Sequence, residues 1–407
     1  MLRKTEVDFL LACLRDENPE ETAALAVADD FKWDVFVNLA AVQGVSAILF
    51  KRLRMLRVSG GVPQSALARL KTTYVKNSAR QLFFSAEFGR VLKKLKAENL
   101  PVIALKGTHL ANLVYRDPAL RPMSDIDVLV REEDADQAFA SLLGIGYRQS
   151  SKEAMEDHHH MPGLLNPSGI RVEIHTGIHE HSLPYAIDLA GTWDRAMPAE
   201  FAGAEGLVFA PEDLLLHLCV HAASHNFDCE LRHLWDFREV IETYRDSLDT
   251  GVFSARAREW KVEKAAYVTL RLAEDLLGLK YPEGLLAGIR PAEFRDEYIT
   301  WAEEQIFSDL SLNPSSFGQF KFSREAAAGG LLKTCWRTLF IPKETLAANY
   351  QVPAGSRKIY LYYFLRLKDL LVHYGPSVIN RFRHGDEHYI IANRENCQTL
   401  KDWLVSR

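Results

Sequence analysis

The sequence predicts an α+β protein, in which a small mixed β-sheet lies between N-terminal and C-terminal helical regions. Apolar residues recur at helical spacing over residues 5–100 and again from residue 211 onward. Between these regions, short β-type runs alternate with helical patterns, which is typical of a compact α/β core. We therefore expect three parts: an N-terminal helical region at 1–100, an α/β core at 101–200 and a C-terminal helical domain at 201–407.

Length and composition narrow the class of protein. A chain of 407 residues is too long for one ordinary core, and its 47% apolar content is that of a globular protein. A net charge of −5 argues against a protein that coats nucleic acid. No stretch approaches the roughly 20 apolar residues of a membrane span, so we expect no membrane partner. Five scattered cysteines and acids close to the N-terminus favour the cytoplasm.

The N-terminal part reads as helix because Val7, Leu10, Leu11 and Leu14 share one helical face. A second, longer helix is expected over about 64–98. In the core, we expect strands at 102–106, 125–130 and 170–175 and helices at 108–114 and 132–143. Turn residues at 166–169 predict a hairpin between about 157–165 and 170–176. Pro211-Glu212-Asp213 marks a helix start, and later helices are expected near 230–246, 262–278, 293–308 and 357–374.

Two carboxylates lie close together on one predicted strand. Asp125 and Asp127 are separated by one residue, so they share a face, while Ile126 and Val128 point to the other. Adjacent anionic side chains on a rigid strand repel each other unless a cation lies between them. Hard cations take oxygen ligands, so the pair predicts a site for Mg²⁺ or Mn²⁺.

A turn that suits phosphate precedes this strand. The run at 102–105 ends in Lys106-Gly107-Thr108, directly before a predicted helix. Backbone N–H groups at such a turn suit phosphate oxygens, and Lys106 can add a positive charge. Arg121, in the loop before the aspartates, has two open roles: a phosphate ligand, or a loop residue tied to a carboxylate.

A third carboxylate completes the predicted site. Phosphoryl and nucleotidyl transfer usually need more than two metal-binding carboxylates. Glu173 is the best candidate, because alternation places it on one face of its strand together with Arg171 and His175. A strand beside 125–130 would bring Glu173 to the aspartates and His175 to the edge of the site.

These residues resemble the DNA polymerase beta-like nucleotidyltransferase superfamily, whose signature is a glycine turn, an Asp-x-Asp pair and a later carboxylate. Over roughly residues 30–270 the chain is similar to the bacterial uncharacterised nucleotidyltransferase family. The similar segments are Leu105-Lys106-Gly107, Tyr115-x-Asp117-Pro118, Arg121, Asp125 to Val130, Val172 to His175, Pro211 to His217 and Leu231 to Asp236. Thr108 departs from the more common serine or glycine, and the gap from Gly107 to Asp125 is longer than in many members.

The resemblance implies a Mg²⁺-dependent enzyme that moves a nucleoside monophosphate from an NTP, such as ATP, to a hydroxyl acceptor and releases pyrophosphate. Asp125, Asp127 and Glu173 would hold metal, and Lys106, Gly107, Thr108, Arg121 and His175 would contact the nucleotide. The acceptor would be a small molecule or a protein, because the mild acidity disfavours nucleic acid.

Two alternatives stay open. One is a catalytically silent nucleotide-binding or regulatory protein of the same fold. The other is a histidine-based metallohydrolase, because His217, His221 and His225 are spaced four apart on one helical face. Leu214, Leu218 and Val220 show that the same helix packs, which favours core histidines. Arg232 and Asp236, also four apart, could pair with each other or reach the nucleotide cleft.

Overall fold

The computed structural model describes residues 4–15, 31–55, 61–150, 160–179, 183–225, 227, 229–308, 363 and 387–406. The chain divides into two compact units, one of residues 2–307 with 396–407 and one of residue 1 with 308–395. The sheet and the candidate site lie in the first unit. The helix expected at 357–374 lies outside the described residues, apart from residue 363.

The centre of the first unit is a seven-stranded sheet in the order β3-β4-β5-β2-β1-β7-β6. Its strands are β1 (Ile103–Ala104), β2 (Asp125–Leu129), β3 (Arg148–Gln149), β4 (Leu164–Leu165), β5 (Arg171–His175), β6 (Met197–Phe201) and β7 (Ala204–Val208). The sheet is mixed, because β2 is parallel to β5 and β1 is parallel to β7, whereas the other neighbours are antiparallel. The predicted α+β class is confirmed.

Three predicted strands form, and β4 and β5 make the expected hairpin, with Gly169 at a φ of +81° in its turn. The β6–β7 hairpin was not predicted. Its two turn residues, Ala202 and Gly203, have φ of +49° and +71°, the backbone of a type I′ turn. This hairpin carries the sheet to Val208, past the expected core boundary at residue 200.

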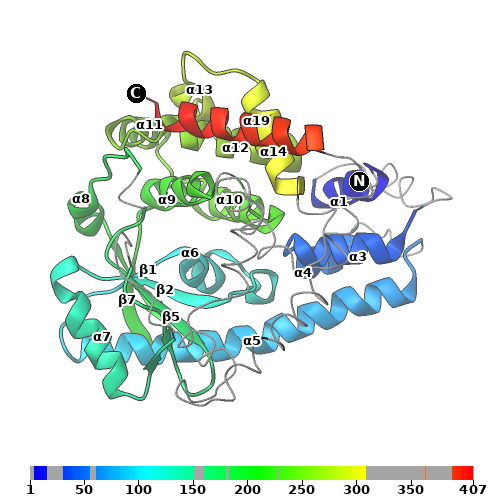
Figure 1. The fold of residues 1–407 in the computed structure, drawn as a ribbon. Helices are drawn as coiled ribbons and strands as arrows, with labels where there is room; N and C mark the ends of the chain where they lie inside the picture. The colour runs from blue at the N-terminus through cyan, green and yellow to red at the C-terminus, as the bar shows by residue number, and fades with distance from the viewer. Residues whose placement is uncertain are drawn as a thin grey trace. The chain divides into compact units, whose positions relative to one another are not determined.

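One face of the sheet is apolar and covered by helices α5 (Gln64–Lys96) and α7 (Ala135–Gly144) (Figure 1). Ile126, Val128, Val172 and Ile174 are fully buried in this core, which they share with Phe88 and other residues of α5. Burying one such aliphatic side chain contributes roughly 1.5–3 kcal/mol. A register slip by one residue would expose all of them, so the core fixes the register and with it the residues on the opposite face.

The N-terminal part is helical, as predicted. It contains α1 (Lys4–Leu14), α3 (Trp33–Val42) and α4 (Ser46–Met55), and α4 lies along α5. Phe9 of α1 is fully buried in a cluster of aromatic rings, with Phe36 of α3 at 5.1 Å between ring centroids. The long helix expected at about 64–98 is therefore α5.

The other face of the sheet carries α6 (Lys106–His109) and a turn of π-helix, η2 (Leu110–Val114), which contacts α10. The remaining elements are η3 (Pro118–Leu120), η4 (Glu132–Asp134), α8 (Leu189–Asp194), α9 (Pro211–Ser224), α10 (Leu231–Tyr244), α11 (Thr250–Glu259), α12 (Glu263–Leu277), α13 (Leu285–Ile289), α14 (Glu297–Ser308) and α19 (Glu387–Val405). Helix α9 begins at Pro211, as predicted. Among the described helices, none is long and apolar enough to cross a bilayer.

Candidate functional site

Strands β2 and β5 place the predicted acidic residues beside each other. The two strands are parallel and in register, so Asp127 lies directly opposite Glu173, and Asp125 lies opposite Arg171. Because Ile126 and Val172 point into the core below, the carboxylates point to the face that carries α6. The sheet thus brings together side chains that are 46 residues apart in sequence, counted from Asp127 to Glu173.

Asp127 is the centre of the site and is only 6% exposed. Its Oδ1 atom lies 2.9 Å from Nε2 of His175 and 3.7 Å from Nζ of Lys106. Burial alone would raise the pKa of Asp127, but the charge of Lys106 and the hydrogen bond from His175 outweigh it and lower the pKa well below its usual value. Asp127 is therefore a carboxylate at neutral pH.

Asp125 lies close to the negative charges of Asp127 and Glu173. Its burial, followed by the negative charges of Asp127 and Glu173, raises the pKa of Asp125 to about 6. A bound cation would stabilise the ionised form of Asp125, because it would offset the negative charges of the neighbouring carboxylates. The donor set therefore fits a divalent metal ion, which is the chemistry that the sequence predicts for this strand.

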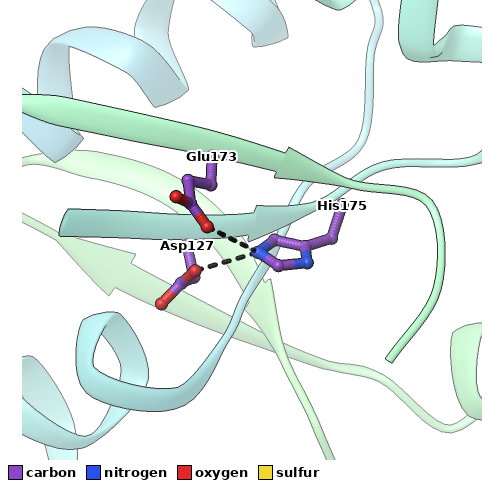
Figure 2. Close-up of side chains that lie close together, drawn as sticks. All are labelled: Asp127, Glu173 and His175. Carbon is purple, nitrogen blue, oxygen red and sulfur yellow. Dashed lines mark hydrogen bonds and ion pairs between the residues drawn. The ribbon is translucent and has the colours of Figure 1, made fainter. Parts of the chain in front are cut away.

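Glu173 and His175 extend the cluster along β5. Oε1 of Glu173 lies 2.7 Å from Nε of Arg171, and Oε2 lies 3.8 Å from Nε2 of His175. Asp127, Glu173 and His175 each offer one ligand atom within 4.8 Å of the others, and across the described part of the chain they form the only such group of three (Figure 2). His175 is 2% exposed and belongs to the cluster, where sequence reasoning placed it at the edge.

The Lys106-Gly107-Thr108 turn is built differently from the expected phosphate cradle. Gly107 and Thr108 are buried. The Thr108 hydroxyl accepts a hydrogen bond from the Asp127 amide at 3.0 Å, and its own amide donates to the Leu105 carbonyl. Thr108 thus ties α6 to the aspartate strand, and its amide is already paired within the turn.

Lys106 is the residue of this turn that keeps part of its side chain exposed, at 18%. Its φ of +41° lies in the left-handed region, which costs a non-glycine residue of the order of 1 kcal/mol. This backbone turns the chain from β1 into α6, close enough to Asp127 for the ammonium group to form an ion pair with the carboxylate.

Of the two roles that the sequence left open, Arg121 has that of a loop residue tied to a carboxylate. It is buried, its Nε donates to Oδ1 of Asp236 at 2.7 Å, and its NH1 donates to the Pro122 carbonyl. The Tyr115 hydroxyl donates to the same Asp236 oxygen, also at 2.7 Å. Arg121 thereby joins the loop before β2 to helix α10. Asp236 does not pair with Arg232, which contacts Glu230 instead.

Two histidines of α9, His217 and His221, and His225 directly after the helix each lie against another ring. His217 is fully buried against Phe209, with ring centroids 5.4 Å apart, and His221 lies against His225 at 4.8 Å. No three of them bring ligand atoms together among the described residues, so the structure offers no histidine-only metal site there. His217 does contribute to the electrostatics of Asp127, a proximity that no sequence signal indicated.

Comparison with protein families gives the class of protein, a nucleotidyltransferase. The chain belongs to the uncharacterised nucleotidyltransferase family, whose sequence profile matches residues 29–278. This confirms the resemblance stated from the sequence and supports nucleotidyl transfer as the general class of activity.

A solved structure of an antigenic nucleotidyltransferase-like protein from Paracoccidioides brasiliensis shares 17% identity with the chain. The match covers 48% of this chain and 93% of that chain, with a TM-score of 0.32, and we draw nothing further from a likeness at that level. No match was found among curated protein sequences.

Proposed function

We propose that the protein is a divalent-metal-dependent nucleotidyltransferase that moves a nucleoside monophosphate from an NTP, with ATP as the first candidate, to a hydroxyl acceptor. The observation that carries the proposal is the in-register pairing of Asp127 with Glu173 on parallel strands, with Asp125 and Lys106 beside them. Family membership points to the same class of reaction.

Each residue has a distinct task. Asp125, Asp127 and Glu173 would hold Mg²⁺ or Mn²⁺, which when bound stabilises the negative charge that develops on the phosphate oxygens. Lys106 would bind the triphosphate, because its ammonium group is partly exposed beside the carboxylates. Glu173 would accept the proton of the acceptor hydroxyl. That oxygen bonds to the α-phosphorus, the bond from the α-phosphorus to the bridging oxygen breaks, and pyrophosphate leaves.

For the acceptor we propose only a chemical class, not a particular molecule. A small molecule or a protein side chain suits a chain with a net charge of −5 better than nucleic acid does. The cytoplasm is the proposed compartment, since Cys13 and Cys219 are buried thiols, in keeping with a reducing environment.

The test uses NTPs labelled at the α-phosphate, incubated with the protein, Mg²⁺ or Mn²⁺ and a cell extract. We expect wild type and the exposed-acid control Glu133→Gln to transfer label, and Asp127→Asn to transfer none. Label that appears equally with Asp127→Asn, or with no protein added, refutes the proposal. NTP binding by calorimetry without any transfer would instead support the catalytically silent alternative.

Lys106 can be tested separately. Lys106→Met removes the ammonium group from beside Asp127 and retains a long apolar stem. We expect NTP affinity to fall by about tenfold or more, since one charge-assisted contact to phosphate contributes about 1.5–3 kcal/mol. Unchanged NTP affinity would remove Lys106 from the proposed site.

A further inference from the structure

We propose that His175 is a nitrogen ligand of the metal and that the site therefore binds Mn²⁺ in preference to Mg²⁺. This inference rests on the proposed function for the presence of a divalent metal. It changes the ligand set from three carboxylates to a group in which Asp127, Glu173 and His175 surround one position.

The spacing of the three side chains fits a single ion. Nε2 of His175 lies 2.9 Å from Oδ1 of Asp127 and 3.8 Å from Oε2 of Glu173 (Figure 2). Ligands bound at about 2.1 Å lie roughly 3.0 Å apart when they are at right angles and about 3.4 Å apart in a tetrahedral arrangement. The first distance matches the right-angle value, and the second is about 0.4 Å longer than the tetrahedral value. One ion can therefore contact the imidazole and Asp127 nearly in place, and it can reach Glu173 after a shift of that side chain.

His175 is held in this position by the sheet. It is the last residue of β5, it is opposite Leu129 of β2, and its carbonyl accepts the amide of Val130 at 2.9 Å. Strand alternation puts its ring on the face of Glu173, and its burial to 2% exposure restricts other positions of the ring. The imidazole is thus a fixed part of the cluster.

Asp125 is the residue that the three-carboxylate arrangement would use instead. It shares the face of Asp127, yet it belongs to no group of three converging ligand atoms among the described residues. Within the cluster, the third donor beside Asp127 and Glu173 is a nitrogen. Asp125 can still serve a metal carried by the nucleotide.

The donor atoms decide which metal binds best. Mg²⁺ takes oxygen ligands and loses water reluctantly, whereas Mn²⁺ accepts carboxylates and, like the later divalent metals, also accepts imidazole. A site of two carboxylates and one imidazole therefore favours Mn²⁺ over Mg²⁺. We expect the Kd for Mn²⁺ to be at least about tenfold lower than that for Mg²⁺ in the protein without nucleotide.

The test reads the ligand atom directly. Full-length protein is loaded with Mn²⁺ in the absence of NTP, and pulsed electron paramagnetic resonance measures coupling to ¹⁴N, or to ¹⁵N in labelled protein. We expect a coupled histidine nitrogen in wild type and in the exposed control His225→Gln, and its loss in His175→Gln, which keeps a hydrogen-bonding side chain. Titration of free Mn²⁺ with Mg²⁺ competition gives the two affinities.

Absence of nitrogen coupling in wild type, retention of it in His175→Gln, or equal affinity for Mg²⁺ and Mn²⁺ overturns the inference. The wild-type spectrum does not depend on whether the variant folds. Turnover is not part of the measurement, so nitrogen coupling without any nucleotidyl transfer would refute the proposed function alone. Transfer by a protein whose Mn²⁺ has oxygen ligands only would refute the histidine ligand alone.

Discussion

Replacing Arg121 with methionine is expected to lower the free energy of unfolding by about 3–5 kcal/mol, because it leaves a charged partner buried. Asp236 is 1% exposed, and it would keep only the Tyr115 hydroxyl as a donor. At the observed separation of 2.7 Å and an effective dielectric constant of about 20, the lost attraction is roughly 6 kcal/mol. The desolvation of Arg121, which the variant no longer requires, offsets part of that loss.

Urea unfolding followed by tryptophan fluorescence measures this effect. The matched control is Arg69→Met, which removes an exposed ion pair with Asp34 and is expected to cost less than about 1 kcal/mol. Tyr115→Phe should fall between the two, at about 1–2 kcal/mol, since it removes one hydrogen bond to the buried carboxylate.

The double variant Arg121→Met with Asp236→Leu separates the pair from the rest of the fold. Removing both charges should restore most of the stability that Arg121→Met loses, because no unpaired charge stays buried. If Arg121→Met costs no more than the Arg69 control, the structural role is refuted. A loss of NTP affinity at unchanged stability would instead assign Arg121 to phosphate, the other role that the sequence left open.

Three further predictions concern the rest of the fold. Burial lowers the pKa of His109 to about 3, from an ordinary value of 6.5, so the unfolded state binds more protons between these values. The free energy of unfolding should therefore fall as pH falls below 6.5, by about 1.4 kcal/mol at pH 5.5. Urea titrations at pH 8 and 5.5 measure this loss, and the loss due to His109 should be absent in His109→Gln. Burial, opposed only partly by the charge of Arg52, raises the pKa of Cys13 to about 12. Native protein should therefore resist alkylation of Cys13 at pH 8, and rapid alkylation would show that the thiol is not buried. Gly44→Ala should lower the thermal midpoint, because Gly44 has a φ of +65°, a backbone conformation that strains any residue with a Cβ. An unchanged midpoint would show that the turn relaxes easily.

The sequence by itself determined which side chains could share a face. Alternation with a period of two is a local property of a strand, so Asp125 with Asp127, and Glu173 with His175, followed from spacing alone. The helix start at Pro211 was equally local, since proline and first-turn acids act on the backbone beside them. The order of motifs also carried the family resemblance, which the profile match confirms.

Local sequence patterns could not predict the β6–β7 hairpin or the contacts between segments that are far apart in sequence. The β6–β7 hairpin depends on two adjacent residues with positive φ, and Ala202 gives no signal for that conformation. Thr108 was expected to help hold the triphosphate, and no local pattern showed that its hydroxyl bonds to the Asp127 amide, which it does because α6 lies directly on β2. Such contacts depend on which helix covers which strand.

Only the tertiary structure decided which charged residues contact each other. Arg121 and Asp236 are 115 positions apart, and burial makes each the partner that the other requires. The parallel register of β2 and β5 brings His175 to within 2.9 Å of Asp127 and leaves Asp125 outside the three converging ligands. Sequence spacing set the donors on each strand, and the pairing of the strands, fixed by the apolar face beneath them, selected the group that converges.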